Sequence, residues 1–193
     1  MTNKLLAVIR HSEREKGNEK LSPRGIYLAE SRIAQLSREY PAPSIVAVSD
    51  YERAENTARA MGCAITHKDP SLSKSVESWE GIPWGKPFIE IAKAYQTDQN
   101  TKNLGNLHAD VYRNYASGIR ENNLGLLITH DTRAEAALAS LLQNRTNLEE
   151  IAQRLGSSLD YSEGYVLSFL PDKKTIIKIR TLRTDREKEA VIE

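Results

Sequence analysis

The feature that most constrains this chain is a series of short, continuous apolar runs separated by segments with helix signals. The runs cover 5–9, 45–48, 124–129, 166–170 and 175–179. A run that is apolar at every position is expected for a strand covered on both faces of a sheet. The last two runs are joined by a short turn, which predicts an antiparallel hairpin and therefore a mixed sheet.

Helix start signals fall between these runs. Ser22-Pro23 offers an N-cap followed by proline at the first helical position, and that helix is expected to run to about Glu39. Capping boxes are predicted at 49–52 and 132–135, each directly after an apolar run, and a further helix is expected to open at Thr146. Alternating strands and helices predict an α/β fold: a three-layer sandwich with a mostly parallel central sheet flanked by helices.

The segment 69–123 departs from this alternation because it carries tryptophans, prolines and glycines before helical stretches near 88–95 and 107–121. We expect a mainly helical insertion that packs over one edge of the sheet and covers the site. The length of 193 residues is typical of a single domain, 1–193. The highly charged end, 184–193, is expected to be a solvated helix or a disordered tail.

Composition excludes several functional classes. Lys and Arg total 27 and Asp and Glu total 26, so the formal charge is +1, without the basic excess of a nucleic-acid binder. The single cysteine, Cys63, allows neither an intramolecular disulfide nor a zinc site built from cysteine pairs. A free-thiol chain with no apolar stretch of membrane-spanning length is predicted to be cytoplasmic and to have no membrane partner.

The chemically informative residues follow the best strands. Arg10-His11 ends the first apolar run, Arg53 comes shortly after the second, and His130 ends the third. Ligands of open α/β sheets bind outside the carboxyl ends of the strands, so these side chains are expected to converge on one crevice. Arginine captures oxyanions such as phosphate, and histidine can act there as nucleophile, acid or donor. The sequence therefore predicts a phosphate or carboxylate site beside a histidine.

Four motifs occur in the order of a known family. Residues 10–13 (Arg-His-Ser-Glu) resemble the Arg-His-Gly-Glu signature of the histidine phosphatase superfamily, the phosphoglycerate mutase-like proteins. Residues 21–29 are similar to the family's Leu-Thr-x-x-Gly-x-x-Gln-Ala stretch, and 49–58 to its Ser-x-x-x-Arg-Ala-x-Gln-Thr-Ala stretch. Residues 127–131 resemble the segment around the second histidine, and 79–81 match a Trp-Glu-Gly seen in many members.

This resemblance implies a two-step phosphoryl transfer with no metal and no cofactor. His11 would attack phosphorus and become phosphohistidine, and water would then release phosphate. Arg10, Arg53 and His130 would hold the phosphoryl oxygens, in keeping with the dependence of phosphoryl transfer on positioning and cationic charge. A buried carbonyl or carboxylate should hold the other ring nitrogen of His11, and Glu13 is the local candidate, unless it pairs with an arginine of the site.

The chain also departs from the family pattern. Serine (Ser12) and aspartate (Asp131) stand where the family has a glycine after each histidine. Asp131 could donate its backbone N–H to the substrate if its carboxylate turns away to cap the helix. Arg14 replaces a small Ser or Thr and is expected to touch the substrate. We therefore predict a substrate-binding role for Ser12, Glu13, Arg14 and Asp131.

The general acid is the most serious departure. Many members carry a glutamate seven residues before the Glu of Trp-Glu-Gly, where this chain has Ser73. Glu77 is the nearest replacement, with Glu80 behind it. Some short members that act on phosphohistidine in proteins lack this acid, because a protonated nitrogen leaving group needs less help.

The sequence thus predicts a histidine phosphatase that hydrolyses a phosphorylated small molecule and binds no nucleic acid. A phosphohistidine phosphatase acting on a phosphoprotein is the first alternative, and a catalytically impaired phosphate-ligand binding protein of the same fold is the second. Mutase activity is less favoured because the longer substrate-closing segments of the mutases have no counterpart. Neither the physiological substrate nor the oligomeric state follows from the sequence.

Overall fold

A computed structural model of the chain describes residues 3–144, 148–170, 175–183 and 189–191. The strands are β1 (Lys4–Arg10), β2 (Pro43–Val48), β3 (His67–Lys68), β4 (Leu124–Thr129), β5 (Gly164–Phe169), β6 (Ile176–Leu182) and β7 (Glu189–Val191). The helices are α1 (Pro23–Glu39), α2 (Glu52–Ala60), the 3₁₀ helix η1 (Pro70–Leu72), α3 (Phe88–Thr97), α4 (Gln99–Gly118), α5 (Arg133–Leu142) and α6 (Leu148–Leu155).

The described strands form one sheet in the order β3-β2-β4-β1-β5-β6-β7. The strands β3, β2, β4 and β1 run parallel to one another. In the remaining pairs, β5 is antiparallel to β1, β6 to β5, and β7 to β6. The expected antiparallel pairing of the last two apolar runs is confirmed as β5 and β6; the turn between them lies outside the described residues. As a result, the carboxyl ends of β1, β2 and β4 and the start of β5 lie at the same edge of the sheet.

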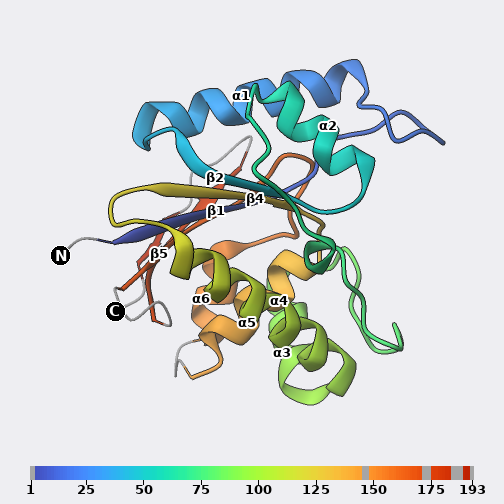
Figure 1. Cartoon of the computed structure of the whole chain (residues 1–193). Helices are drawn as coiled ribbons and strands as arrows, with labels where there is room; N and C mark the ends of the chain where they lie inside the picture. Colours follow the sequence, from blue (N-terminus) through green and yellow to red (C-terminus); the bar gives the residue numbers. More distant parts are fainter. Residues whose placement is uncertain (1–2, 145–147, 171–174, 184–188, 192–193) are drawn as a thin grey trace.

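Helices cover both faces of the sheet (Figure 1). Side chains alternate between the faces along β1: Ala7 and Ile9 pack in the core with α1 and α2, while Leu6 and Val8 pack in the core with α3 to α6. This arrangement confirms the predicted α/β sandwich, and it explains why the central strands carry apolar side chains on both faces.

The segment predicted to be an insertion supplies α3 and α4. Tyr112, Ala116 and Ile119 of α4 belong to the same core cluster as Leu6 and Leu127 of the central strands. The expectation that this segment packs over an edge of the sheet is therefore wrong, because α4 lies against a face. The apolar spacing of α4 matches a buried helical stripe. The assignment of 1–193 to a single domain stays a prediction.

Local helix signals gave mixed results. The Ser22 cap is confirmed, since its side chain accepts a hydrogen bond from the Gly25 N–H and proline follows it. The capping box at 49–52 is wrong, because the N-cap of α2 is Tyr51, two residues later than predicted, and the Tyr51 side chain makes no capping hydrogen bond. At 132–135 the helix does begin directly after Thr132, as predicted, but Thr132 has φ of 58° and its side chain makes no capping hydrogen bond, so the capping box itself is wrong. The helix start expected at Thr146 lies outside the described residues.

The charged end of the chain contains a strand. Residues 189–191 form β7, which pairs with β6, so the expectation of a solvated helix or disordered tail is wrong for them. The other residues of 184–193 lie outside the described part. Within the described residues, no helix is both long and apolar enough to span a bilayer.

Candidate functional site

His11 lies directly after β1, where its backbone N–H donates to the carbonyl of Thr129 at 2.9 Å. Its ring has two defined partners. The Nδ1 atom lies 2.8 Å from the carbonyl oxygen of Ser12, and the Nε2 atom accepts a hydrogen bond from Nε of Arg53 at 3.1 Å. A carbonyl can only accept, so Nδ1 carries the proton and Nε2 presents its lone pair. The expected buried carbonyl is thus present, and Glu13 does not fill that role.

The environment keeps both site histidines neutral. Burial, with the positive charges of Arg53 and Arg10, lowers the pKa of His11 from 6.5 to about 3, although the bond to Ser12 opposes the shift. Burial also lowers the pKa of His130 to about 2, and the neighbouring His11 and Arg133 act in the same direction. Neutral imidazoles are therefore the forms present at ordinary pH.

His130 stands beside His11 at the end of β4, with the two ring centroids 5.1 Å apart. Its Nε2 atom lies 3.0 Å from the hydroxyl of Ser49, and its Nδ1 atom lies 3.5 Å from Nη2 of Arg53. The ring of Tyr51 meets it edge-on at 5.0 Å. Ser49, placed in a capping box by sequence reasoning, instead orients the second histidine.

The two predicted arginines approach His11 from different elements. Arg53 extends from α2 and contacts both histidines, while its guanidinium lies 4.3 Å from the ring centre of Tyr51. Arg10 ends β1 and donates to the carbonyl of Leu159 at 2.7 Å. Its guanidinium lies 4.4 Å above the ring of Tyr161. The structure therefore gathers His11, His130, Arg10 and Arg53 into one cluster at the carboxyl edge of the sheet.

Asp131 does not cap α5. Its carboxylate lies 3.4 Å from Nη2 of Arg10, so it turns toward a cation of the cluster. Thr132, not Asp131, occupies the N-cap position of α5, with φ of 58° and no side-chain cap bond. Asp131 therefore partly neutralises the charge that Arg10 offers to an anion.

Ser12 and Glu13 face away from the cluster. Ser12 is fully buried; its hydroxyl donates to the carbonyl of Gly25 at 2.6 Å and its N–H donates to Oγ1 of Thr57 at 2.8 Å. Glu13 accepts hydrogen bonds from Ser22 and from Arg24 on α1. Both residues thus join the strand exit to the two helices, and neither presents its side chain to His11.

Arg14 reaches the cluster through a residue that sequence reasoning missed. Nη1 of Arg14 lies 2.7 Å from Oε1 of Glu19, and Nη1 of Arg53 lies 3.0 Å from the same oxygen. Glu19 sits on the short hairpin after β1, in which Arg14 and Leu21 form an antiparallel bridge. No spacing rule links a hairpin carboxylate to an arginine on α2, so only the folded chain reveals this contact.

The candidate acid Glu77 is exposed on the segment between η1 and α3, and it has no hydrogen bond or ion pair to any part of the chain that the structure describes. Ser73, which stands at the family's acid position, donates its hydroxyl to the carboxylate of Asp50. No described contact connects either residue to His11.

Tyr161 is a further residue that the motifs missed, although a topological signal was available. It precedes β5, which runs antiparallel to β1, with Ile9 opposite Gly164. Because β5 runs antiparallel to β1, the residues just before β5 lie beside the carboxyl end of β1. The carbonyl of Glu163 accordingly accepts the N–H of Arg10 at 2.8 Å, and the Tyr161 ring centre lies 5.9 Å from that of His11.

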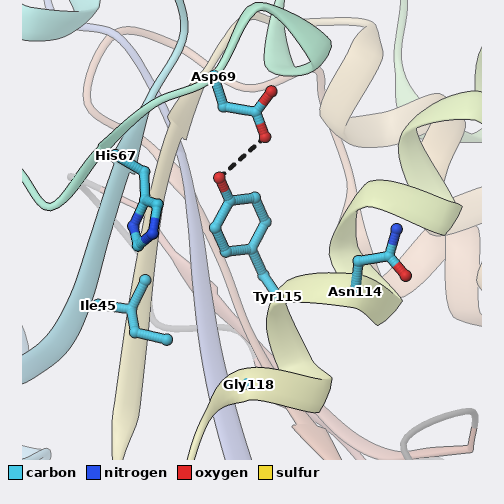
Figure 2. A pocket seen from close by; sticks show the side chains of 6 residues that line it. All are labelled: Ile45, His67, Asp69, Asn114, Tyr115 and Gly118. Atoms are coloured by element: carbon cyan, nitrogen blue, oxygen red, sulfur yellow. Dashed lines mark hydrogen bonds between the residues drawn. The ribbon is translucent and has the colours of Figure 1, made fainter.

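Other parts of the described chain offer no comparable cluster. Among the described residues, no three His, Cys, Asp or Glu side chains are close enough to hold a metal ion. A separate hollow lies between β2, β3 and α4 (Figure 2). There Tyr115 donates to Asp69 at 2.8 Å and His67 stands beside the tyrosine ring, but none of the predicted site residues lines it.

Comparison with solved structures identifies the fold. The chain superposes on a phosphoserine phosphatase from Entamoeba histolytica, crystallised with 3-phosphoglyceric acid, with a TM-score of 0.61, 14% identity, and coverage of 94% of this chain and 98% of that one. A protein described as mycobacterial hydrolase 1 superposes with a TM-score of 0.62 and 16% identity, and the match covers 96% of this chain and 99% of that one. A protein described as the putative phosphohistidine phosphatase SixA from Agrobacterium tumefaciens superposes with a TM-score of 0.52 and 14% identity, and the match covers 86% of this chain and 92% of that one.

These neighbours are phosphatases, or described hydrolases, with the histidine phosphatase fold, so the fold predicted from the four motifs is confirmed. At 14–16% identity the likeness extends to the fold alone. No protein-family model and no curated protein matched the sequence.

Proposed function

We propose that this protein is a phosphomonoester hydrolase that works through a phosphohistidine intermediate on His11. The observation that carries the proposal is the state of the His11 ring: Nδ1–H is held by a backbone carbonyl while the Nε2 lone pair faces the cluster of cations. A nucleophile fixed in the reactive tautomer beside cationic side chains matches what phosphoryl transfer requires.

In the first step, the Nε2 lone pair of His11 forms a bond to phosphorus as the bond between phosphorus and the leaving oxygen breaks. The electron pair of the broken bond stays on that oxygen, which takes a proton from Glu77 or from solvent and leaves as the alcohol. For this, Arg53 must turn its Nε–H from His11 to a phosphoryl oxygen. Arg10 and His130 complete the set of donors around the phosphoryl group. Because the arginines supply the positive charge, the step needs no metal ion.

In the second step, water attacks phosphorus and the P–N bond breaks, which returns the electron pair to Nε2. The products are inorganic phosphate and the restored imidazole, and the water proton leaves with phosphate or solvent. The carbonyl of Ser12 keeps the Nδ1 proton in place through both steps, because that acceptor belongs to the backbone and cannot be titrated.

The exposed position of Glu77 supports a second candidate function. A hydrolase acting on an alcohol phosphate benefits from an acid that protonates the leaving oxygen, and Glu77 is exposed, with no hydrogen bond or ion pair to the described residues. A phosphohistidine on a protein offers a leaving nitrogen that needs less help. A phosphohistidine phosphatase acting on a phosphoprotein is therefore the alternative, and Glu77 serves as the acid only in the first proposal.

The decisive experiment measures hydrolysis of an activated aryl phosphate by the purified protein in the presence of a chelator. We expect turnover in the parent, inhibition by vanadate, and loss of activity in His11→Asn. Arg53→Lys should lower kcat/KM by about 10²- to 10³-fold, as for removal of a transition-state donor. The matched control is His67→Asn, which changes an exposed histidine outside the cluster.

The outcomes separate the candidate functions. A parent that binds phosphate without hydrolysing any substrate would overturn the hydrolase proposal in favour of a phosphate-ligand binding protein. Comparison of Glu77→Gln on an activated and a poor leaving group tests the acid: a loss confined to the poor leaving group supports it, whereas an equal effect or none removes Glu77 from the role. Preferential hydrolysis of a phosphohistidine protein would favour the second candidate.

A further inference from the structure

Glu19 places a carboxylate on the outer side of the proposed phosphoryl site. Both of its oxygens accept hydrogen bonds from Nη1 of Arg53, at 3.0 and 3.2 Å, and Oε1 also accepts from Nη1 of Arg14 at 2.7 Å. The contact is partly shielded, because the side chains of Arg53 and Glu19 are 18% and 32% exposed. One carboxylate thus bridges two arginines where the protein would receive an anion.

Every nitrogen of the Arg53 guanidinium has a protein partner in this arrangement. The Nε atom donates to Nε2 of His11, Nη1 donates to Glu19, and Nη2 lies 3.5 Å from Nδ1 of His130. The lone pair that His11 needs for attack is therefore occupied by an N–H of Arg53. The free protein is arranged as a closed network that an incoming phosphoryl group must open.

We propose that Glu19 is an internal anion that competes with the phosphoryl group for Arg53, and that Arg14 retains Glu19 when Arg53 is released. The inference rests on the proposed function, since it takes Arg53 as a ligand of the phosphoryl group. Arg14 suits the retaining role because it already holds Oε1 of Glu19 and is the more exposed of the two arginines.

A competing carboxylate selects for strongly anionic ligands. A phosphomonoester dianion brings two charges and three free oxygens, so it can replace one carboxylate on Arg53 and also accept hydrogen bonds from Arg10. A phosphodiester or a simple carboxylate carries a single charge and gains less from the exchange. Glu19 therefore makes the site selective for phosphomonoester dianions over monoanions of similar shape.

The test measures binding of inorganic phosphate by titration calorimetry to the whole chain and to variants that differ by one charge. Glu19→Gln should bind phosphate about threefold to tenfold more tightly, the scale of a partly exposed ion pair. Arg14→Gln should bind it more weakly, because displaced Glu19 loses its partner. In the Glu19→Gln background, Arg14→Gln should have no further effect.

Glu55→Gln provides the matched control for general loss of negative charge. Glu55 also neighbours Arg53 on α2, but its carboxylate pairs with Arg59 and Lys68 on the surface. Phosphate affinity in this variant should equal that of the parent. If Glu55→Gln tightened binding as much as Glu19→Gln, the effect would be long-range electrostatics and the competition would be refuted.

The remaining outcomes also decide the question. An unchanged affinity in Glu19→Gln overturns the proposal, as does failure of both the parent and Glu19→Gln to bind phosphate. If Arg14→Gln weakens binding equally in both backgrounds, Arg14 contacts the anion directly and does not serve as the retaining partner. Phosphate binding without hydrolysis would refute the proposed enzyme while leaving this comparison intact.

Discussion

The neutrality of His11 has a measurable consequence for the acid stability of the protein. Burial beside cations lowers its pKa to about 3, whereas an unfolded histidine titrates near about 6.5. Between these values the unfolded chain binds the proton and the native chain does not, so the free energy of unfolding falls as the pH falls below about 6.5. Above that pH, His11 makes no contribution to the pH dependence.

The magnitude follows from linkage. Moving from about pH 7.5 to about pH 5, a histidine with these two pKa values removes about 2 kcal/mol from the free energy of unfolding. His11→Asn should lose about 2 kcal/mol less than the parent over the same interval. Asparagine suits this test because its amide N–H₂ can donate to the Ser12 carbonyl as Nδ1 does, and it does not titrate.

The assay is urea unfolding of the parent and His11→Asn at both pH values, followed by tryptophan fluorescence. His67→Asn, which alters an exposed histidine on β3, is the control for replacing a histidine outside the cluster. An equal loss in the parent and His11→Asn would refute the inference that His11 is held neutral by burial. Nitrogen NMR of the ring provides an independent check, since Nδ1 should stay protonated and Nε2 unprotonated at about pH 5.

Further predictions concern packing and activity. Gly25→Ala should lower the free energy of unfolding by about 1–3 kcal/mol in the same urea assay, because a Cβ there would lie 2.0 Å from the carbonyl oxygen of Glu13; Gly118→Ala, whose Cβ would meet only a side-chain carbon at 3.7 Å, should change it little. Tyr112→Phe should leave the thermal midpoint equal to or higher than that of the parent, since it removes a buried hydroxyl that has no hydrogen-bond partner among the described residues, and a lower midpoint would contradict this. The kcat/KM of the parent should show no acid limb near about pH 6.5 from His11, which is already neutral there; an enzyme group that must lose a proton near that pH for activity, and that the substrate does not supply, would contradict the assigned state.

The central fold could be predicted from local pattern. Near-continuous apolar runs, such as 5–9 and 124–129, are typical of strands buried between two layers of helices, and the structure places β1 and β4 there. The Ser22-Pro23 signal worked because both its parts act within one helical turn. The capping boxes at 49–52 and 132–135 failed because their side chains form hydrogen bonds with residues far away in the chain. Ser49 bonds to His130, and Glu135 accepts the N–H of Leu159 inside the core.

The candidate site was predictable to the extent that it follows the strand exits. Arg10, His11, Arg53 and His130 converge because the carboxyl ends of parallel strands meet at one edge. The orientation of each side chain was not predictable, because it depends on contacts between residues far apart in the chain. Asp131 turned to Arg10 where a helix cap was expected.

By itself, the sequence determined which strands are buried, where the reactive residues leave them, and that their charges are those of an anion site. These properties are local, since burial pattern and strand exit depend on residues within a few positions of each other. Only the tertiary structure decided that Ser12, not Glu13, holds the His11 ring, and that Glu19 bridges Arg14 and Arg53. Hydrogen bonds and ion pairs act over a few ångströms in space, and the sequence does not state which distant residues come that close.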